Sequence, residues 1–242
     1  MTVPPAGSGA LDRLAVVAAE REAAGLRRAV RPRDADDTLL DLAGNDYLGL
    51  ARDPRVVAGA VEAARTWGAG ATGSRLVRGT TVLHEQLEAA LAAHAGFPAA
   101  LVFSSGYLAN LGAVTALAPA GSLVVADALN HASLIDACRL ARADVVVVPH
   151  LDVEAVAEAL ATRSQEQALV LTDTVFSVDG DAADLTALHA VARRHGAALL
   201  VDDAHGLGVV GGAGRGSAWA AGIAGAEDVV VTATLSKALG SQ

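Results

Sequence analysis

Six runs of Val, Leu and Ala have the length and the nearly uniform apolar character of buried strands. They cover residues 99–104, 122–127, 144–149, 168–173, 197–203 and 228–233. Segments in which apolar positions recur with helical spacing lie between most of these runs, at 82–94, 105–117, 132–141, 152–162 and 184–195. This alternation predicts an α/β fold in three layers, with a mainly parallel sheet flanked by helices on both faces.

The N-terminal part of the chain follows a different pattern. Residues 11–30 are polar and rich in alanine, which predicts a helix, and residues 38–42 predict a short strand. Asp53-Pro54 favours a helix start, because aspartate is a good N-cap and proline fits the first helical position. We therefore expect a helical arm over 1–40 and one large domain over 41–242.

Composition and charge narrow the classes of function. The 27 acidic and 18 basic side chains give a net charge of −9, and the scattered basic residues argue against a nucleic-acid partner. The single cysteine, Cys138, excludes an internal disulfide and fits a reducing cytoplasm. No apolar stretch approaches the roughly 20 residues that cross a bilayer, and the N-terminus lacks the order of a secretory signal. We expect a soluble cytoplasmic protein that binds no membrane.

Polar residues follow five of the six predicted strands. In an open α/β sheet, ligands bind outside the carboxyl ends of the strands, so these residues should share one site. The residues concerned are Gly106, Tyr107, His131, Ser177, Asp202, His205, Thr234 and Lys237.

Lys237 indicates the chemistry of this site. It stands between an apolar strand and Ala-Leu-Gly, where surface lysines are unusual, and a desolvated lysine acts as nucleophile and base. An aspartate such as Asp202 keeps a pyridine nitrogen protonated, and the helix N-terminus at Gly106 suits a phosphate. The combination predicts a pyridoxal 5′-phosphate (PLP) enzyme in which Lys237 holds the cofactor as a Schiff base.

Each partner of Lys237 has an ordinary interpretation when it is taken alone. Taken alone, Ser105 can be simply a helix cap and Asp202 a residue that caps a loop. His131 can be a polar residue at a helix N-terminus. The same holds for His205 and Ser177. Their combination with the lysine is what favours a cofactor site.

Other chemistries find weaker support. Gly206 to Gly211 matches GxGxxG, but the glycine-rich residues 212–216 do not open the helix that a dinucleotide site requires. No serine stands in a GxSxG elbow. His150, His189 and His195 are isolated on separate elements, so no metal cluster is expected.

Six motifs resemble those of the α-oxoamine synthases, a family of fold-type-I PLP enzymes, and they occur in the same order. They are NDYLGL (45–50), SSGYLAN (104–110), NHASLIDACR (130–139), DTVFSVDGD (173–181), VDDAHGLGVVGGAGRGS (201–217) and TLSKALGSQ (234–242). The resemblance implies the major domain of that fold. Relatives continue for well over a hundred residues past the lysine, so we expect the C-terminal small domain to be missing here.

The resemblance also implies roles for the residues at the strand ends. Lys237 would bind PLP and later move the Cα proton of the substrate, Asp202 would pair with the pyridine nitrogen, and His131 would stack on the ring and border the substrate. The phenolic oxygen would lie near His205 and Ser177, and the phosphate near Gly106, Tyr107 and Thr234. Asp173 departs from the glutamate that is more usual in the family and is left outside the expected site.

Substrates are implied by fewer residues. The stretches at 26–28 and 67–80 are most similar to members that condense L-alanine with pimeloyl-CoA, or with a pimeloyl carrier protein, and lose CO₂ in biotin synthesis. Arg27 would hold the remote carboxylate of the acyl group. Asn45 and the loop 68–80 would complete a site shared between two subunits of a homodimer. A glycine-using relative, such as 2-amino-3-ketobutyrate CoA ligase, and a catalytically incompetent fragment stay open as alternatives.

Overall fold

The computed structural model describes residues 9–241 and divides into two units, Met1–Ala43 and Gly44–Gln242. The first unit contains α1 (Asp12–Ala23), none of whose residues is buried. The helix predicted over 11–30 is therefore present but shorter. It ends because Gly25 takes a left-handed conformation (φ 68°) and the Leu26 amide turns back to the Arg21 carbonyl.

The strand predicted over 38–42 is wrong. Residues 38–42 form no strand in the structure, and the side chains of Leu39, Leu40 and Leu42 are 81%, 82% and 87% exposed. An apolar run becomes a strand only when a neighbouring strand pairs with it, and the first unit offers none among its described residues.

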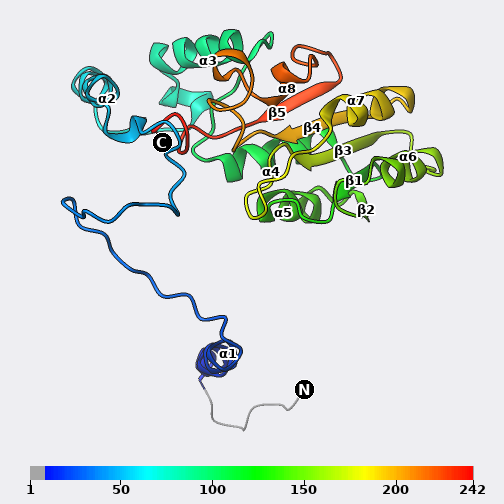
Figure 1. Ribbon diagram of the computed structural model, residues 1–242, viewed down its shortest axis with the longest axis horizontal. Coiled ribbons are helices and arrows are strands. Elements are labelled where there is room, and N and C mark those ends of the chain that lie inside the picture. Colours follow the sequence, from blue (N-terminus) through cyan, green and yellow to red (C-terminus); the bar gives the residue numbers. More distant parts are fainter. Residues whose placement is uncertain (1–8, 242) are drawn as a thin grey trace. The chain divides into compact units, whose positions relative to one another are not determined.

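In the second unit, more residues lie in helices than in strands (Figure 1). The first of them begins where the sequence predicted, because Asp53 accepts the Arg55 amide and Pro54 occupies the first helical position. The α-helices are α2 (Pro54–Trp67), α3 (Val82–Ala95), α4 (Gly106–Leu117), α5 (Ala132–Ala141), α6 (Val153–Ala161), α7 (Leu185–Arg194) and α8 (Ser217–Ala220). Short helical turns are η1 (Leu50–Arg52), η2 (Arg75–Gly79) and η3 (Gly212–Gly214). Across residues 9–241, no helix combines the length and the apolar character needed to span a membrane.

Five parallel strands form the sheet, in the order β2-β1-β3-β4-β5. They are β1 (Leu123–Asp127), β2 (Asp144–Val148), β3 (Ala168–Asp173), β4 (Ala198–Asp202) and β5 (Val229–Thr232). These five of the six predicted strands are confirmed, and so is the mainly parallel α/β sheet.

Helices cover both faces of the sheet, so the three-layer prediction is confirmed. Alternate strand residues such as Val125 and Val201 pack under α6, α7 and α8, whereas Val124 and Leu200 pack under α4 and α5. All four of these valine and leucine side chains are fully buried. Burial on both faces explains why the strands consist almost entirely of apolar residues.

The remaining predicted strand, over 99–104, is wrong. The Val102 amide donates to Glu88 Oε1 at 2.8 Å, and the Val102 carbonyl accepts from Arg75 Nη1 at 2.9 Å. Arg75 and Glu88 also form an ion pair of 2.8 Å. These two side chains satisfy the backbone groups that a neighbouring strand would have bonded.

Candidate active site

Three adjacent strands end in aspartate at the same edge of the sheet. Asp127 ends β1, Asp173 ends β3 and Asp202 ends β4, and Asp173 lies directly beside Asp202 in the register. All three residues are buried. Burying several carboxylates at one edge is costly unless hydrogen bonds or cations compensate, so their partners define what the site can hold.

Asp202 is held by Asn110, a residue of α4 that is 2% exposed. Asn110 Nδ2 donates to Asp202 Oδ2 at 2.7 Å and to Ser133 Oγ at 2.8 Å, and Asn110 Oδ1 accepts from Thr232 Oγ1 at 2.5 Å. The second Asp202 oxygen accepts the Ala204 amide at 3.0 Å. Both polar atoms of the Asn110 amide are therefore hydrogen-bonded, and the amide fixes the orientation of the Asp202 carboxylate.

The same network reaches His131, the N-cap of α5. His131 Nδ1 accepts the Ser133 amide at 3.2 Å and lies 2.7 Å from Ser133 Oγ. Because Nδ1 is an acceptor, the ring proton of the neutral imidazole resides on Nε2. Asn110 thus connects the residue predicted to face a pyridine nitrogen with the residue predicted to stack on the ring.

Asp173 accepts the His131 amide at 2.7 Å through Oδ2. Burial and the negative charge of Asp202 raise the pKa of Asp173 to about 7. The hydrogen bond from the His131 amide and the charge of Lys237 lower this pKa and offset part of the rise. The Asp173 carboxyl is therefore partly protonated near neutral pH, whereas an exposed aspartate would be fully ionised. Sequence reasoning left this residue outside the site, although it lies within its hydrogen-bonded network.

Lys237 follows β5, and its amine lies 2.8 Å from His205 Nε2. Burial lowers the pKa of Lys237, and the charges of Asp202 and Asp173 act in the opposite direction. Burial, followed by the charge of Lys237, also lowers the pKa of His205. An amine with a lowered pKa beside a neutral imidazole is suited to attack a carbonyl and to move a proton.

A second row of hydrogen bonds extends from His205 away from the lysine. His205 Nδ1 lies 2.7 Å from Tyr47 Oη, and the Tyr47 hydroxyl donates to Asn45 Oδ1 at 2.9 Å. The hydroxyl has one proton, so it accepts from Nδ1, which leaves His205 Nε2 free to accept from the lysine. Asn45 and Tyr47, both in the NDYLGL motif, thereby set the tautomer of His205.

The N-terminus of α4 presents donors at this edge. Ser105 Oγ accepts the Leu108 amide at 3.2 Å, whereas the Gly106 and Tyr107 amides have no acceptor within residues 9–241. A Cβ atom built on Gly106 would lie 3.5 Å from the Thr234 side chain, so the helix start and the Lys237 segment adjoin. Free amides and the positive end of a helix dipole bind anions.

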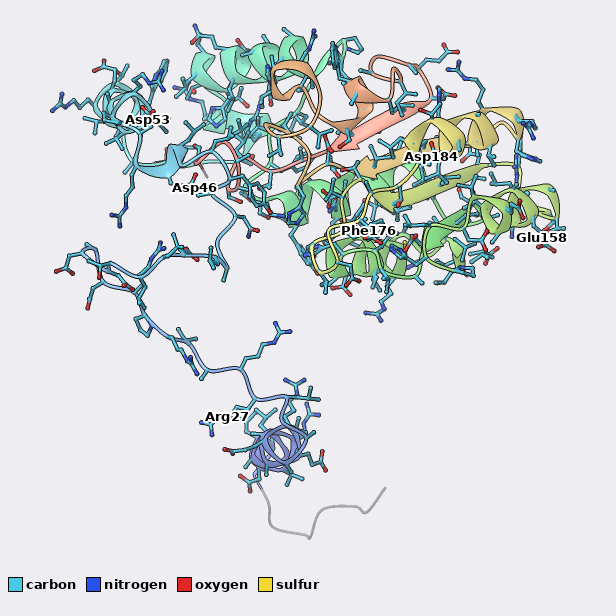
Figure 2. All side chains as sticks on the ribbon, viewed as in Figure 1. Arg27, Asp46, Asp53, Glu158, Phe176 and Asp184 are labelled. Atoms are coloured by element: carbon cyan, nitrogen blue, oxygen red, sulfur yellow. The ribbon has the colours of Figure 1, made fainter. Side chains whose placement is uncertain are left out.

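Two predicted side chains form no hydrogen bond with this cluster within residues 9–241, and a third predicted residue, Arg27, lies in the first unit. Tyr107 Oη donates to Asp136 Oδ2 at 2.6 Å, and Ser177 lies exposed in the turn of residues 175–182. Arg27 belongs to the first unit, beyond the end of α1 (Figure 2), where it forms an exposed ion pair of 2.7 Å with Glu22. Within residues 9–241 no group of three side chains has the arrangement of a metal site.

Comparison with known proteins identifies the family. The model for aminotransferase class I and II matches residues 37–242. The chain belongs to this family.

Named relatives add more detail. The 8-amino-7-oxononanoate synthase of Mycolicibacterium gilvum is 64% identical over 237 residues, which are 98% of this chain and 62% of that protein. The chain therefore spans less than two thirds of the length of this curated relative.

Solved structures agree on the fold. Serine palmitoyltransferase of Sphingomonas wittichii is 37% identical, with a TM-score of 0.87 over 97% of this chain and 62% of its own. A variant of the S. paucimobilis serine palmitoyltransferase, solved with a PLP-myriocin aldimine, is 33% identical, with a TM-score of 0.83 over the same shares. The fold of this chain is thus that of enzymes that have been seen with PLP.

Sequence reasoning overlooked Asn110 and Tyr47. Both stand in motifs that carried the family resemblance, yet neither was assigned a role. The available signal was an asparagine within an otherwise apolar helix, where a buried amide requires partners. Tyr47 offered no such signal, because its contact with His205 joins positions 158 residues apart.

Proposed function

We propose that the unit Gly44–Gln242 binds PLP and that Lys237 bonds to the aldehyde carbon of the cofactor. The observation that carries the proposal is the position of the Lys237 amine, 2.8 Å from His205 and within the field of Asp202 and Asp173. Lys237 is also the only lysine of the chain. A single lysine, partly desolvated at the ligand edge of the sheet, is difficult to explain as a solubilising residue.

The remaining residues fit the parts of this cofactor. The free amides of Gly106 and Tyr107, with the Thr234 hydroxyl, suit a phosphate, and the anchored Asp202 carboxylate suits a protonated pyridine nitrogen. His131 and Ser177 would border the ring and its phenolic oxygen. When bound, PLP supplies an electron sink for a carbanion at the substrate α-carbon.

Side chains of the protein would then carry out the proton transfers. Lys237, with its lowered pKa, accepts the α-proton of the amino acid and returns it, and His205 Nε2 accepts from the lysine ammonium. Tyr47 would hold His205 in the required tautomer, and Asn110 would hold the Asp202 carboxylate in place for the ring nitrogen.

The reaction proposed is the condensation of L-alanine with pimeloyl-CoA, or with pimeloyl carrier protein, to give 8-amino-7-oxononanoate, with loss of the thiol carrier and CO₂. The 64% identity to a relative of that name supports this choice over serine or glycine as substrate. We further propose a cytoplasmic homodimer, in which Asn45 and the loop 68–80 complete the site and Arg27 binds the pimeloyl carboxylate.

Borohydride reduction tests the cofactor assignment. Incubation with PLP followed by reduction should fix one phosphopyridoxyl group on Lys237, identified by peptide mass spectrometry. Lys237→Arg keeps the charge but cannot form the bond, so its peptide should carry none. Labelling confined to the N-terminal amine, or equal labelling in both proteins, would overturn the assignment.

Product analysis tests the substrates. With PLP and pimeloyl-CoA, L-alanine should give the condensed product and CO₂, while glycine and L-serine should give at most a small fraction of that rate. A preference for glycine or serine would contradict the proposed reaction and leave the cofactor assignment intact.

A further inference from the structure

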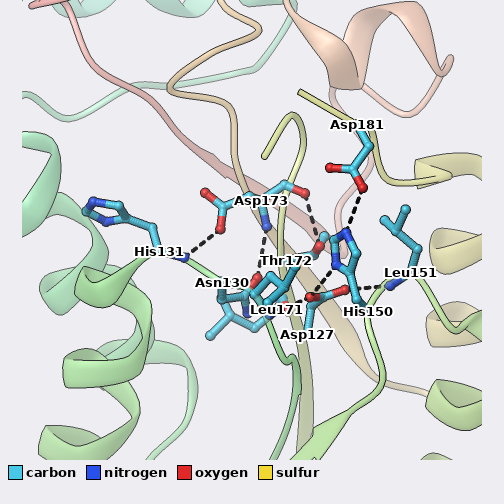
Figure 3. A network of polar contacts seen from close by, with 10 residues as sticks. Asp127, Asn130, His131, His150, Leu151, Leu171, Thr172, Asp173 and Asp181 are labelled. Atoms are coloured by element: carbon cyan, nitrogen blue, oxygen red, sulfur yellow. Dashed lines mark hydrogen bonds and ion pairs between the residues drawn. The ribbon is translucent and has the colours of Figure 1, made fainter. Parts of the chain in front are cut away.

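His150 lies between two carboxylates at the same edge of the sheet (Figure 3). Its Nδ1 is 2.9 Å from Asp127 Oδ1, and its Nε2 is 2.7 Å from Asp181 Oδ2. Neither carboxylate oxygen can donate when ionised, so both ring nitrogens must carry a proton for both bonds to form. The geometry therefore describes an imidazolium that bridges two anions.

The two carboxylates belong to the loops that carry predicted cofactor residues. Asp127 ends β1, and its Oδ1 also accepts the Leu129 amide at 2.8 Å, in the loop that leads to His131. Asp181 belongs to the Ser177 hairpin, defined here as residues 175–182, which is closed by a bridge between Val175 and Ala182. His150 thus joins the loop before His131 to the hairpin that holds Ser177.

The hairpin contains backbone hydrogen bonds of its own and one buried ring. Within it, the Phe176 amide donates to the Asp181 carbonyl and the Gly180 amide to the Phe176 carbonyl, each at 2.9 Å. The Phe176 ring is buried and meets the His150 ring edge to face, with the centroids 4.4 Å apart. His150 therefore contacts the hairpin both through its charge and through its ring.

The backbone conformation of the residue after His150 depends on the same aspartate that binds the ring. Leu151 takes a left-handed conformation (φ 59°), which is unfavourable for a leucine because its Cβ approaches the backbone. The Leu151 amide donates to Asp127 Oδ2 at 2.8 Å, so the aspartate that binds the imidazolium also sustains this conformation. Both oxygens of Asp127 are occupied in fixing the turn that presents His150.

Other charged groups on the packed elements do not compete for the ring. Asp152 caps α6 by accepting the Ala155 amide, and Asp184 caps α7 by accepting the Ala187 amide. Asp173 accepts the His131 amide. Asp127 and Asp181 raise the pKa of His150 above its ordinary value of 6.5, which extends the charged state toward neutral pH.

We infer that His150 is a positioning residue, which as a bridging imidazolium holds the Ser177 hairpin against the loop that leads to His131. The part of this inference that places Ser177 beside the ring of PLP rests on the proposed function. Loss of the ring proton breaks one of the two bonds and leaves a nitrogen lone pair facing a carboxylate. The hairpin should then open more often as pH rises through the titration of His150.

Amide hydrogen exchange on the chain without cofactor tests this inference. In His150→Gln, the Phe176 and Gly180 amides should lose at least about tenfold of their protection at pH 6.5, while β3 amides such as Val170 keep theirs. His189→Gln is the matched control, because His189 Nε2 also binds a carboxylate, Asp228, at 2.9 Å. It should leave the hairpin amides unchanged.

The pH profile separates positioning from a general loss of stability. Wild-type protection of the hairpin, corrected for intrinsic exchange, should fall in step with deprotonation of His150 followed by side-chain NMR, and should stay flat in His150→Gln. Asp181→Asn, which changes a half-exposed side chain, should give a partial loss. Equal protection in wild type and His150→Gln, or a flat wild-type profile while His150 titrates, would overturn the inference. A chain that does not bind PLP would contradict the proposed function but not this result.

Discussion

His205 and His150 lie at the same edge of the sheet, and their neighbours shift the pKa values of the two rings in opposite directions. His205 follows β4 between the Lys237 amine and the Tyr47 hydroxyl, and burial and the lysine lower its pKa. His150 follows β2 between Asp127 and Asp181, which raise its pKa. The difference teaches that the charge of a histidine is set by its contacts and not by its place in the fold.

The two surroundings also serve different purposes. A neutral imidazole can accept a proton from the lysine and return it, which is useful for chemistry. A charged imidazolium shared by two carboxylates cannot, but it links two loops more strongly than a neutral hydrogen bond does. The region around His205 is thus suited to proton transfer, and the region around His150 to holding the site in shape.

Removing the buried anion beside His150 should have the largest effect. Asp127→Ala leaves Nδ1 of the imidazolium and the amides of Leu129 and Leu151 without their acceptor, and should lower the free energy of unfolding by about 3 kcal/mol. Urea denaturation measures the change. Asp152→Ala, which removes only a helix cap, should cost about 1 kcal/mol. Equal losses for the two variants would show that the imidazolium contributes no stability.

Asp173→Asn should stabilise the protein without cofactor at high pH. The pKa of Asp173 is about 7 in the folded protein and near 3.8 when unfolded, so its contribution to stability falls as pH rises from about 4 to 7. The variant removes the repulsion with Asp202 and keeps an acceptor for the His131 amide. We expect a gain of about 2 kcal/mol at pH 8 and none at pH 4, measured by thermal unfolding. A pH-independent gain would contradict the raised pKa.

Side-chain NMR compares the two histidines directly. His150 should titrate above 6.5 and His205 below it, and near pH 6.5 His205 should be the Nδ1–H tautomer. Lys237→Met removes the cation next to His205 and should move its titration toward the ordinary value, with no change at His150. If the pKa values of both rings lay on the same side of 6.5, the contrast between His150 and His205 would be wrong.

Tyr47→Phe should have the smallest effect on stability. The partly exposed hydroxyl contributes less than about 1 kcal/mol, but its loss frees His205 Nδ1 and allows the other tautomer. We expect a near-normal unfolding midpoint together with a changed tautomer ratio in the ¹⁵N spectrum. Leu48→Ala, at an exposed neighbour, is the control and should leave the tautomer as in the wild type. An unchanged ratio in Tyr47→Phe would show that the lysine alone orients His205.

Long, strongly patterned elements could be predicted from the sequence. The five strands of the sheet and the helices between them appear within one or two residues of the predicted bounds, because buried strands and amphipathic helices carry their own periodicity. The carboxyl-edge rule then predicts that Asp202, His205 and Lys237 share one edge of the sheet. Residues 99–104 failed this reasoning, since Arg75 and Glu88 took the place of a neighbouring strand.

Contacts between side chains distant in sequence could not be predicted in this way. His150, His189 and His195 were interpreted as isolated, yet His150 binds residues 23 and 31 positions away and His189 binds Asp228. The sequence by itself determined the α/β layers, the ligand edge and the lone lysine, because these depend on local periodicity and strand direction. Only the tertiary structure decided which histidine is charged and how Asn110 and Tyr47 serve the site. Those properties depend on distances of about 3 Å between elements that the chain connects only through its fold.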